Sequence, residues 1–300
     1  MSLLAVKPVP EAAIVRHGPI ITAEMLPGSD GNNINGPSLI KVPEWLHDPL
    51  GQYYLYFAHH QGSYIRLAYA DAVTGPWTVY EPGTLSLADC SAFLSGHMAS
   101  PDVWVDDENE QINMLFHGHS IVDGAGRTFS ATSEDGIDFS PSSEILGAHY
   151  ARVFQHGEFA YTILGSRNHY VARSSDGLSN YTPGPRILWG DERHVAVQKV
   201  GTTLRVFYTR KGDAPERIFM GTIDLTQDWM DWNVENSVPI MRPIMEYEGA
   251  HLPLTVSTAG RAFDPENALR DPAIYEEGGQ AWLLYATAGE QAIAIAELNF

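Results

Sequence analysis

The sequence predicts an all-β protein, a single five-bladed β-propeller that spans residues 1–300. Three observations lead to this prediction. The chain repeats a unit in which an aromatic-rich segment precedes a second segment of alternating small and apolar residues. A turn signal such as Asp-Gly or Gly-Pro-Trp follows in most units, and no amphipathic helical stretch of convincing length interrupts them. Alternation between turn signals, with many β-branched and aromatic residues, is typical of strands.

The repeated unit occurs five times along the chain. The strand pairs are expected at residues 53–58 with 65–71, 112–117 with 129–134, 159–163 with 170–175, 204–208 with 218–224, and 281–285 with 293–298. A further apolar run precedes each pair, at residues 36–40, 100–105, 150–154, 193–197 and 270–275. Five units of three or four antiparallel strands describe five blades. A large β-sandwich is the alternative, but it would not explain why the first strand of each unit begins with polar residues.

The composition argues against several classes of binding partner and of structural site. The 300 residues carry 37 acidic and 18 basic side chains, a formal net charge of −19, which disfavours nucleic acid and anionic membrane surfaces as partners. Cys90 is the only cysteine, so an internal disulfide and a cysteine-based zinc site are excluded. The sequence has neither an apolar run long enough to span a bilayer nor a signal-peptide pattern at its start. We therefore expect a cytoplasmic protein.

The polar residues at the blade starts are the candidates for a site. In a propeller the first strand of each blade lines the central channel, so these residues converge although they are far apart in sequence. Charged side chains are rarely buried without partners, so such a cluster is either a paired structural network or a site. The residues predicted to meet at the axis are Asn33, Asn35, Asp102, Arg152, Arg193, His194, Arg270 and Asp271.

Three local motifs resemble a known superfamily. The segment from Tyr53 to Trp77 is similar to blade one of the five-bladed propeller superfamily that contains arabinanases, β-xylosidases, invertases and levansucrases, with glycoside hydrolase family 43 among its members. Ser100-Pro101-Asp102-Val103-Trp104 resembles its Ala-Pro-Asp-Val strand, and Arg270-Asp271-Pro272 resembles the Arg-Asp-Pro motif of the invertase and levansucrase branch. The resemblance implies a glycoside hydrolase that acts on a small carbohydrate and requires no cofactor.

Glycoside hydrolysis requires one carboxylic acid that protonates the leaving oxygen and a second carboxylate that acts as base or nucleophile. The resemblance implies that Asp271 holds sugar hydroxyls and stabilises the transition state. Asp102 and Glu192 complete the predicted catalytic set; Glu192 is the leading general acid and Glu248 a second candidate for that role. The predicted substrate-binding residues are polar or aromatic side chains near blade starts: Asn33, Asn35, Trp104, Arg152, Arg193 and Arg270.

The sequence departs from the superfamily pattern at Gly36. The superfamily places its base or nucleophile Asp there, immediately before a proline, and glycine cannot accept a proton. Three hypotheses therefore stay open: a glycoside hydrolase, a sugar-binding propeller that has lost its base, and a phosphorylase or lyase on the same scaffold. A phosphorylase would use arginine side chains to hold phosphate in place of a base-activated water.

The 12 histidines raise the question of a metal. Two histidines separated by one residue, as in His117-Gly118-His119, point to the same face of a strand, which suits metal ligation. No third ligand follows at a fixed spacing, and hydrogen-bonded histidines at blade ends are the alternative. His194 has a predicted axial position, where it could hold a water-coordinated divalent cation such as Ca²⁺ in the channel or act as an acid.

Overall fold

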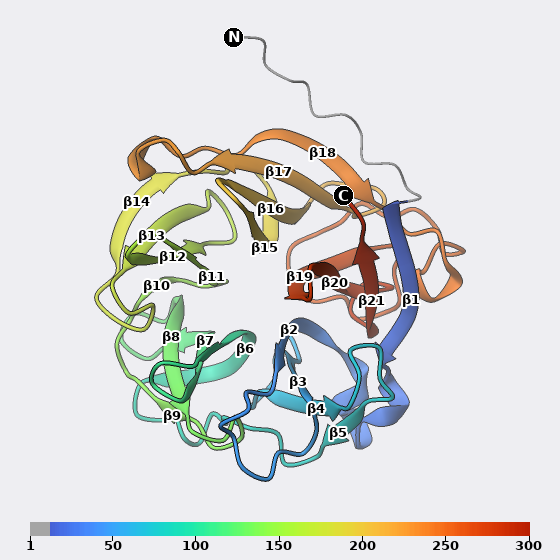
Figure 1. Ribbon diagram of the computed structural model, residues 1–300. Helices are drawn as coiled ribbons and strands as arrows, with labels where there is room; N and C mark the ends of the chain where they lie inside the picture. The colour runs from blue at the N-terminus through green and yellow to red at the C-terminus, as the bar shows by residue number, and fades with distance from the viewer. Residues whose placement is uncertain (1–12) are drawn as a thin grey trace.

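The computed structural model of the chain describes residues 13–300, which form five antiparallel β-sheets around a central axis (Figure 1). The predicted fold class is confirmed. In the first two blades the strands run from the axis outward as follows: β2 (Asn35–Lys41), β3 (Tyr53–Ala58), β4 (Arg66–Ala70) and β5 (Thr78–Tyr80), then β6 (Leu94–Asp106), β7 (Gln111–Ser120) and β8 (Gly126–Ser133), with β9 (Ser140–Pro141) and β10 (Gly147–Ala148) both paired to β8.

The third and fourth blades have four strands each, again in order from the axis outward. They are β11 (Arg152–His156), β12 (Phe159–Leu164), β13 (Tyr170–Ser174) and β14 (Thr182–Arg186), then β15 (Glu192–Val200), β16 (Thr203–Arg210), β17 (Ile218–Asp224) and β18 (Glu235–Met241). The helices described in residues 13–300 are short 3-10 turns: η2 (Ala23–Met25), η3 (Gly28–Asn32), η4 (Trp229–Asp231) and η5 (Glu246–Glu248). None of them is long and apolar enough to cross a membrane.

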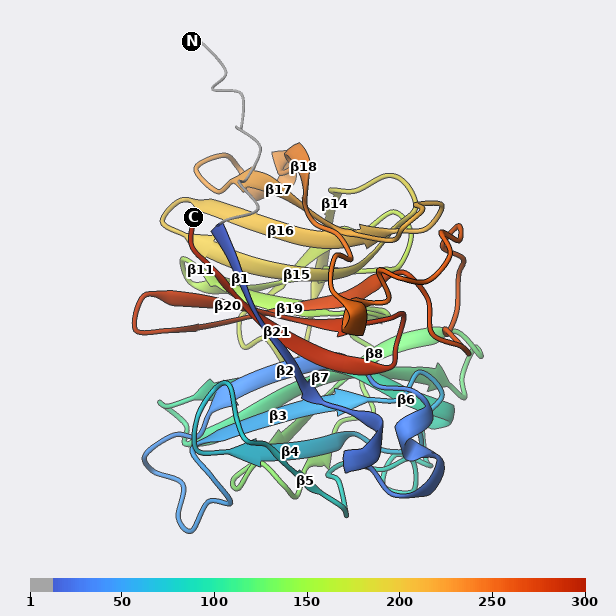
Figure 2. The same cartoon turned by 90° about the vertical axis from the view of Figure 1, so that its right-hand side faces the viewer.

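The fifth blade joins the two ends of the chain. Its inner strands β19 (Leu269–Glu277), β20 (Gln280–Thr287) and β21 (Ala292–Leu298) come from the C-terminal part, and its outermost strand is β1 (Ile14–Ile21), which pairs antiparallel with β21 (Figure 2). Arg16 of β1 donates to Glu248 Oε1 at 2.9 Å, and Tyr285 of β20 donates to the same oxygen. The structure therefore places Glu248, a sequence candidate for the acid, in the closure of the ring.

The core lies between neighbouring blades, because both faces of each sheet are covered. All six residues of β3 are buried. Leu55 and Phe57 pack in a cluster with residues of the fifth blade, while Tyr54 and Tyr56 pack with residues of the second blade. Side chains alternate between the faces of a strand, so a strand with two buried faces needs apolar or aromatic residues in both registers. This explains the aromatic-rich segment in each repeat.

The five inner strands share one backbone feature at their starts. Gly36, Ser100, Tyr150, His194 and Asp271 have φ values of 60°, 49°, 63°, 54° and 47°. In four blades the pairing register shifts across this residue, as in a β-bulge. A bulge re-aims a side chain out of the regular ladder, and left-handed backbone at residues other than glycine is uncommon and clusters at functional sites. The fold therefore brings these five positions together at the axis.

Candidate functional site

A cavity of about 300 Å³ lies on the axis at the starts of the inner strands. Every blade contributes to its wall, and the residues described as lining it include Asn35, Ser100, Tyr150, Arg193 and Asp271. Five histidines of the first three blades also line it: His60, His97, His117, His119 and His149. The cavity therefore combines an acid, amide and hydroxyl groups, cations and imidazoles from distant parts of the chain.

Asp271, at the start of β19, is the only carboxylate among the described residues that line this cavity. Its side chain is 6% exposed, and Oδ1 lies 3.6 Å from His194 Nε2. Its other oxygen, Oδ2, is buried with no hydrogen-bond partner within residues 13–300. Burial, with the charge of nearby Glu290 as the next cause, raises the pKa of Asp271 to about 7. This carboxyl can therefore hold or release a proton near neutral pH.

A buried ionic network lies behind the cavity, and its arginines already have carboxylate partners. Arg193 binds both oxygens of Glu216, at 2.9 and 2.6 Å. Arg270 donates to Glu216 at 2.9 Å, to Glu290 at 3.2 Å and to the partly exposed Glu266 at 2.7 Å. The two guanidinium groups already balance the two fully buried carboxylates, so a charge on Asp271 would be a further buried anion without its own partner.

The predicted arginine ligands differ in their access to the cavity. Arg193 lines it but is occupied by Glu216. Arg270 is 1% exposed, and three carboxylates surround its guanidinium group. The structure therefore places Arg270 behind the cavity, where it neutralises the network.

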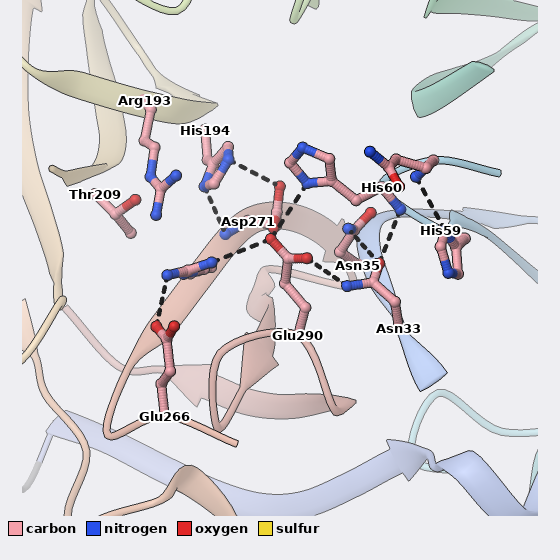
Figure 3. Close-up of polar contacts among 12 residues, drawn as sticks. Asn33, Asn35, His59, His60, Arg193, His194, Thr209, Glu266, Asp271 and Glu290 are labelled. Atoms are coloured by element: carbon pink, nitrogen blue, oxygen red, sulfur yellow. Dashed lines mark hydrogen bonds and ion pairs between the residues drawn. The ribbon is translucent and has the colours of Figure 1, made fainter. Parts of the chain in front are cut away.

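His60, which follows β3, is held by a carboxylate. Its Nδ1 lies 3.4 Å from Glu290 Oε1, and its side chain lines the cavity (Figure 3). Glu290 is fully buried in the turn between β20 and β21 and also accepts from Asn33 and Arg270. Burial alone would raise the pKa of Glu290, but the hydrogen bond from His60 and the charges of His60 and Arg270 outweigh it and hold that pKa below its usual range. Glu290 is thus an anion that orients the His60 ring.

The two asparagines at the start of the first blade, Asn33 before β2 and Asn35 as its first residue, have different places. Asn33 is completely buried, with Nδ2 donating to Glu290 and Oδ1 accepting from the His60 backbone N–H at 2.8 Å. Asn35 lines the cavity, and its Nδ2 donates to Asn33 Oδ1 at 3.0 Å. Of the two predicted ligands, Asn35 can therefore contact a bound molecule, while Asn33 positions Asn35, Glu290 and His60.

Aromatic and imidazole rings form a continuous wall on the side of the second and third blades. The ring centroids are 4.6 Å apart for His97 and His119, 4.9 Å for His117 and Tyr150, and 5.0 Å for His149 and Tyr150. Burial lowers the pKa of His97 to about 4 and also lowers those of His117 and His149. The rings of His97, His117 and His149 are therefore neutral at pH 7 and can each donate one hydrogen bond.

His194, the predicted ligand of an axial cation, lies close to Asp271. Its Nδ1 lies 3.4 Å from the Asp271 backbone N–H, and its Nε2 faces the Asp271 carboxyl. Both ring nitrogens are thus directed at Asp271. Within residues 13–300, no group of three or more His, Cys, Asp or Glu side chains has an arrangement suited to a metal ion.

Three predicted site residues lie around a second cavity of about 360 Å³, further along the inner strands: Asp102, Trp104 and Arg152. Asp102 Oδ2 accepts from the Val153 backbone N–H at 2.7 Å, and Oδ1 lies 3.9 Å from Arg152 Nε. The bond to Val153 ties the inner strand of the second blade to that of the third. The prediction that Asp102 shares a pocket with Asp271 therefore does not match the geometry.

Glu192 also lies apart from Asp271. It begins β15, accepts from the Gly190 backbone N–H at 2.7 Å and lies 3.5 Å from Arg210 Nε. It is not among the described residues that line either axial cavity. At the start of its blade, Glu192 is thus held by a backbone hydrogen bond and an ion pair.

The sequence reasoning did not identify Glu290, Glu216 or Tyr150. Glu290 lies in a hairpin turn after Gly289, and Glu216 in the connection between β16 and β17, where an acidic residue predicts only solvent exposure. Tyr150 had a usable signal, because it occupies the same place at its blade start as His194 and Asp271.

Comparison with known proteins supports the description of the fold. No protein-family model matches the chain. "Uncharacterized protein R118" of Acanthamoeba polyphaga mimivirus is 36% identical over 300 residues, covering 89% of this chain and 83% of that protein. Among solved structures, the GH43_1 enzyme from Xanthomonas citri has a TM-score of 0.63 at 12% identity, covering 94% of this chain and 90% of that one. CoXyl43, a GH43 β-xylosidase/α-arabinofuranosidase from a compost microbial metagenome, has a TM-score of 0.62 at 13% identity, covering 94% and 95%.

Proposed function

We propose that this chain, which belongs to the same family as protein R118 of Acanthamoeba polyphaga mimivirus, is a glycoside hydrolase-like enzyme that binds a small carbohydrate in its axial cavity. The single observation that carries the proposal is Asp271, a buried acid that lines the cavity with one carboxyl oxygen unpaired. The cavity, at about 300 Å³, has the size of a small-ligand pocket. The likeness in fold to GH43 enzymes crystallised with xylose or xylotriose supports a carbohydrate ligand.

Asp271 is proposed as the general acid. A glycosidic bond breaks when the leaving oxygen receives a proton, which requires an acid that is still protonated near the working pH. Burial of the Asp271 carboxyl raises its pKa into that range. The same strategy, an apolar or charge-balanced environment that keeps one carboxyl protonated, separates acid from base in other hydrolytic enzymes. The proton would pass from Asp271 to the leaving oxygen as the bond between that oxygen and the anomeric carbon breaks.

His60 is proposed as the general base. An imidazole held by a buried carboxylate on one nitrogen can accept a proton on the other, as in hydrolytic sites where a third group orients the base. His60 has this arrangement, because Glu290 lies at its Nδ1 and its ring lines the cavity. It would take a proton from a water whose oxygen bonds to the anomeric carbon. Solvent then carries that proton away and returns one to Asp271, so the cycle closes.

A sugar-binding propeller without turnover is the second candidate. Its support is that Gly36 occupies the place of the superfamily's base and that Asp271 has no second carboxylate facing it among the described cavity residues. A phosphorylase, for which Arg152, Arg193 or Arg270 would hold phosphate, has weaker support. Arg193 and Arg270 are occupied by buried carboxylates, and Arg152 lies at the second cavity.

Hydrolysis of aryl and alkyl glycosides of arabinose, xylose, galactose and fructose, with and without phosphate, tests these candidates. Asp271→Asn should lower kcat by about 10²–10⁴-fold, more for alkyl than for nitrophenyl glycosides, because a poor leaving group depends more on the acid. Asp102→Asn is the discriminating variant, since Asp102 lies in the second cavity, and it should change kcat by less than about threefold. Sugar binding by the wild-type protein without any turnover would favour the second candidate.

A further inference from the structure

Lys211, at the end of β16, places a weakly balanced positive charge at the axial cavity. Its side chain is 11% exposed and lines the cavity. The ammonium group donates to the Ser166 carbonyl at 3.3 Å, and the nearest carboxylate, on the 66% exposed Asp191, is 3.8 Å away. An exposed partner at that distance contributes little. Lys211 therefore keeps most of its charge available to a molecule in the cavity.

Arg193, another cation that lines the cavity, differs from Lys211 because its charge is balanced by a buried carboxylate. Arg193 is bound through two nitrogens by the fully buried Glu216. The exposed Arg167 lies close enough to Lys211 to lower its pKa, after the larger effect of burial, and forms no ion pair within residues 13–300. The positive potential beside Lys211 is thus reinforced in a chain whose net charge is −19.

His117 also lines the cavity, and one of its ring nitrogens is buried and unpaired among the described residues. The residue is 6% exposed, and its Nδ1 is buried without a hydrogen-bond partner in the described chain. His97, His119 and His149 lie beside it and line the same cavity. A buried polar atom without a partner costs free energy unless a ligand or water satisfies it. The cavity therefore offers hydrogen-bond donors and a cation to a ligand. The carboxyl group among its described lining residues, that of Asp271, tends to keep its proton.

A neutral sugar would not need such a wall, because its hydroxyls pair equally well with carboxylates and amides. We propose that the sugar bound in the axial cavity carries an anionic group, a carboxylate or a phosphate, which Lys211 and His117 bind. The inference rests on the proposed carbohydrate site but does not depend on hydrolysis. Hydrogen bonds between an ionised donor and an ionised acceptor are about twice as strong as neutral ones. Loss of the Lys211 charge should therefore weaken binding of the acidic sugar about tenfold to a hundredfold.

Binding measured by calorimetry tests the inference with sugars that differ only at carbon 6. The set is galactose, galacturonate and galactose 6-phosphate, together with glucose, glucuronate and glucose 6-phosphate. The wild-type protein should bind one of the acids at least about tenfold more tightly than its neutral counterpart. Lys211→Met should remove that preference by weakening the binding of the acid, whereas Lys211→Arg should retain it. The matched control is Lys199→Met, because the exposed Lys199 of β15 donates to the Gln155 carbonyl and does not line the cavity.

Each outcome bears on the inference separately from the hydrolase proposal. Binding of an acid that depends on Lys211 without turnover of its aryl glycoside would support the anionic group and count against hydrolysis. Turnover confined to neutral glycosides, equal binding of acid and neutral sugars, or no binding of any acid at millimolar concentration would overturn the anionic group. Inorganic phosphate that binds alone in a Lys211-dependent manner would overturn the placement of the charge on the sugar.

Discussion

Asp271→Asn replaces the buried carboxyl with an amide of nearly the same shape that cannot ionise. In the folded protein the pKa of Asp271 is about 7, against an ordinary value of 3.8. The folded state therefore binds more protons than the unfolded chain between about pH 4 and pH 7, and wild-type stability falls as the pH rises through that window. The amide does not pay this penalty, so the variant should overtake the wild type at alkaline pH.

The magnitude follows from the width of that window. A shift of about three pKa units, at about 1.4 kcal/mol each, corresponds to an ionisation penalty of about 4 kcal/mol above pH 7. The gain from the amide is smaller, because its own N–H groups also need hydrogen-bond partners in the buried site. For a chain of this size each kcal/mol moves Tm by about 2–4 °C. We expect Asp271→Asn to melt several degrees above the wild type at pH 8 and close to it at pH 4.

Thermal unfolding followed by circular dichroism from pH 4 to pH 8 is the assay, with Asp135→Asn as the matched control. Asp135 accepts from the Ile137 and Asp138 backbone N–H groups, which outweigh burial and lower its pKa. Its stabilising effect is present above the ordinary aspartate pKa, so Asp135→Asn should lose stability at pH 8. If Asp271→Asn also melted below the wild type at pH 8, Asp271 would be an ionised, paired carboxylate, and the assignment of the acid would fail.

Three further substitutions test the network and the blade starts. Glu290→Gln removes the anion that orients His60 and should lower kcat about a hundredfold with KM little changed; steady-state kinetics in which only KM rises would contradict this role. Glu216→Gln leaves the buried Arg193 guanidinium without its carboxylate partner and removes one of the three carboxylates around Arg270, so it should cost about 3–5 kcal/mol in urea unfolding, and a cost below about 1 kcal/mol would argue against the network. Gly36→Ala, at φ 60° and with the new Cβ 3.2 Å from Ser100 Cα, should lower the urea midpoint by the equivalent of about 1–2 kcal/mol; an unchanged midpoint would refute that packing argument.

The blade pattern could be predicted because the physics that forms it is local. A strand buried on both faces must be apolar in both registers, and Tyr53–Ala58 shows this without any knowledge of its neighbours. The convergence of blade starts was also predictable, and Asn35, Arg193 and Asp271 do line one cavity. The position of each side chain along the propeller axis could not be predicted. Asp102 lies two residues beyond the bulge position, and that offset moves its side chain into the second cavity.

The partners of the site were harder to predict for a different reason. Glu290 and Glu216 lie in connections between strands, where an acidic residue is expected to face solvent, yet each is buried behind the cavity. Their burial depends on arginines that are 20 to 54 residues away in sequence, which no local pattern reports. For Glu192 the difficulty is the opposite one, because its blade-start position was predictable but its pairing with Arg210 was not.

The five left-handed positions show how chemistry can move between blades while the scaffold stays the same. The five share left-handed backbone, and in four blades they lie at a register shift, so an exchange of residues among them alters the site without altering the fold. At Gly36 an added Cβ would lie 3.2 Å from the Ser100 backbone, so a carboxyl there needs the two blades to separate. The acid that we propose is instead Asp271, where burial, followed by the charge of Glu290, favours the protonated form. A base must then come from another element, and His60, held by Glu290 at the end of β3, is the described cavity residue with a carboxylate behind it.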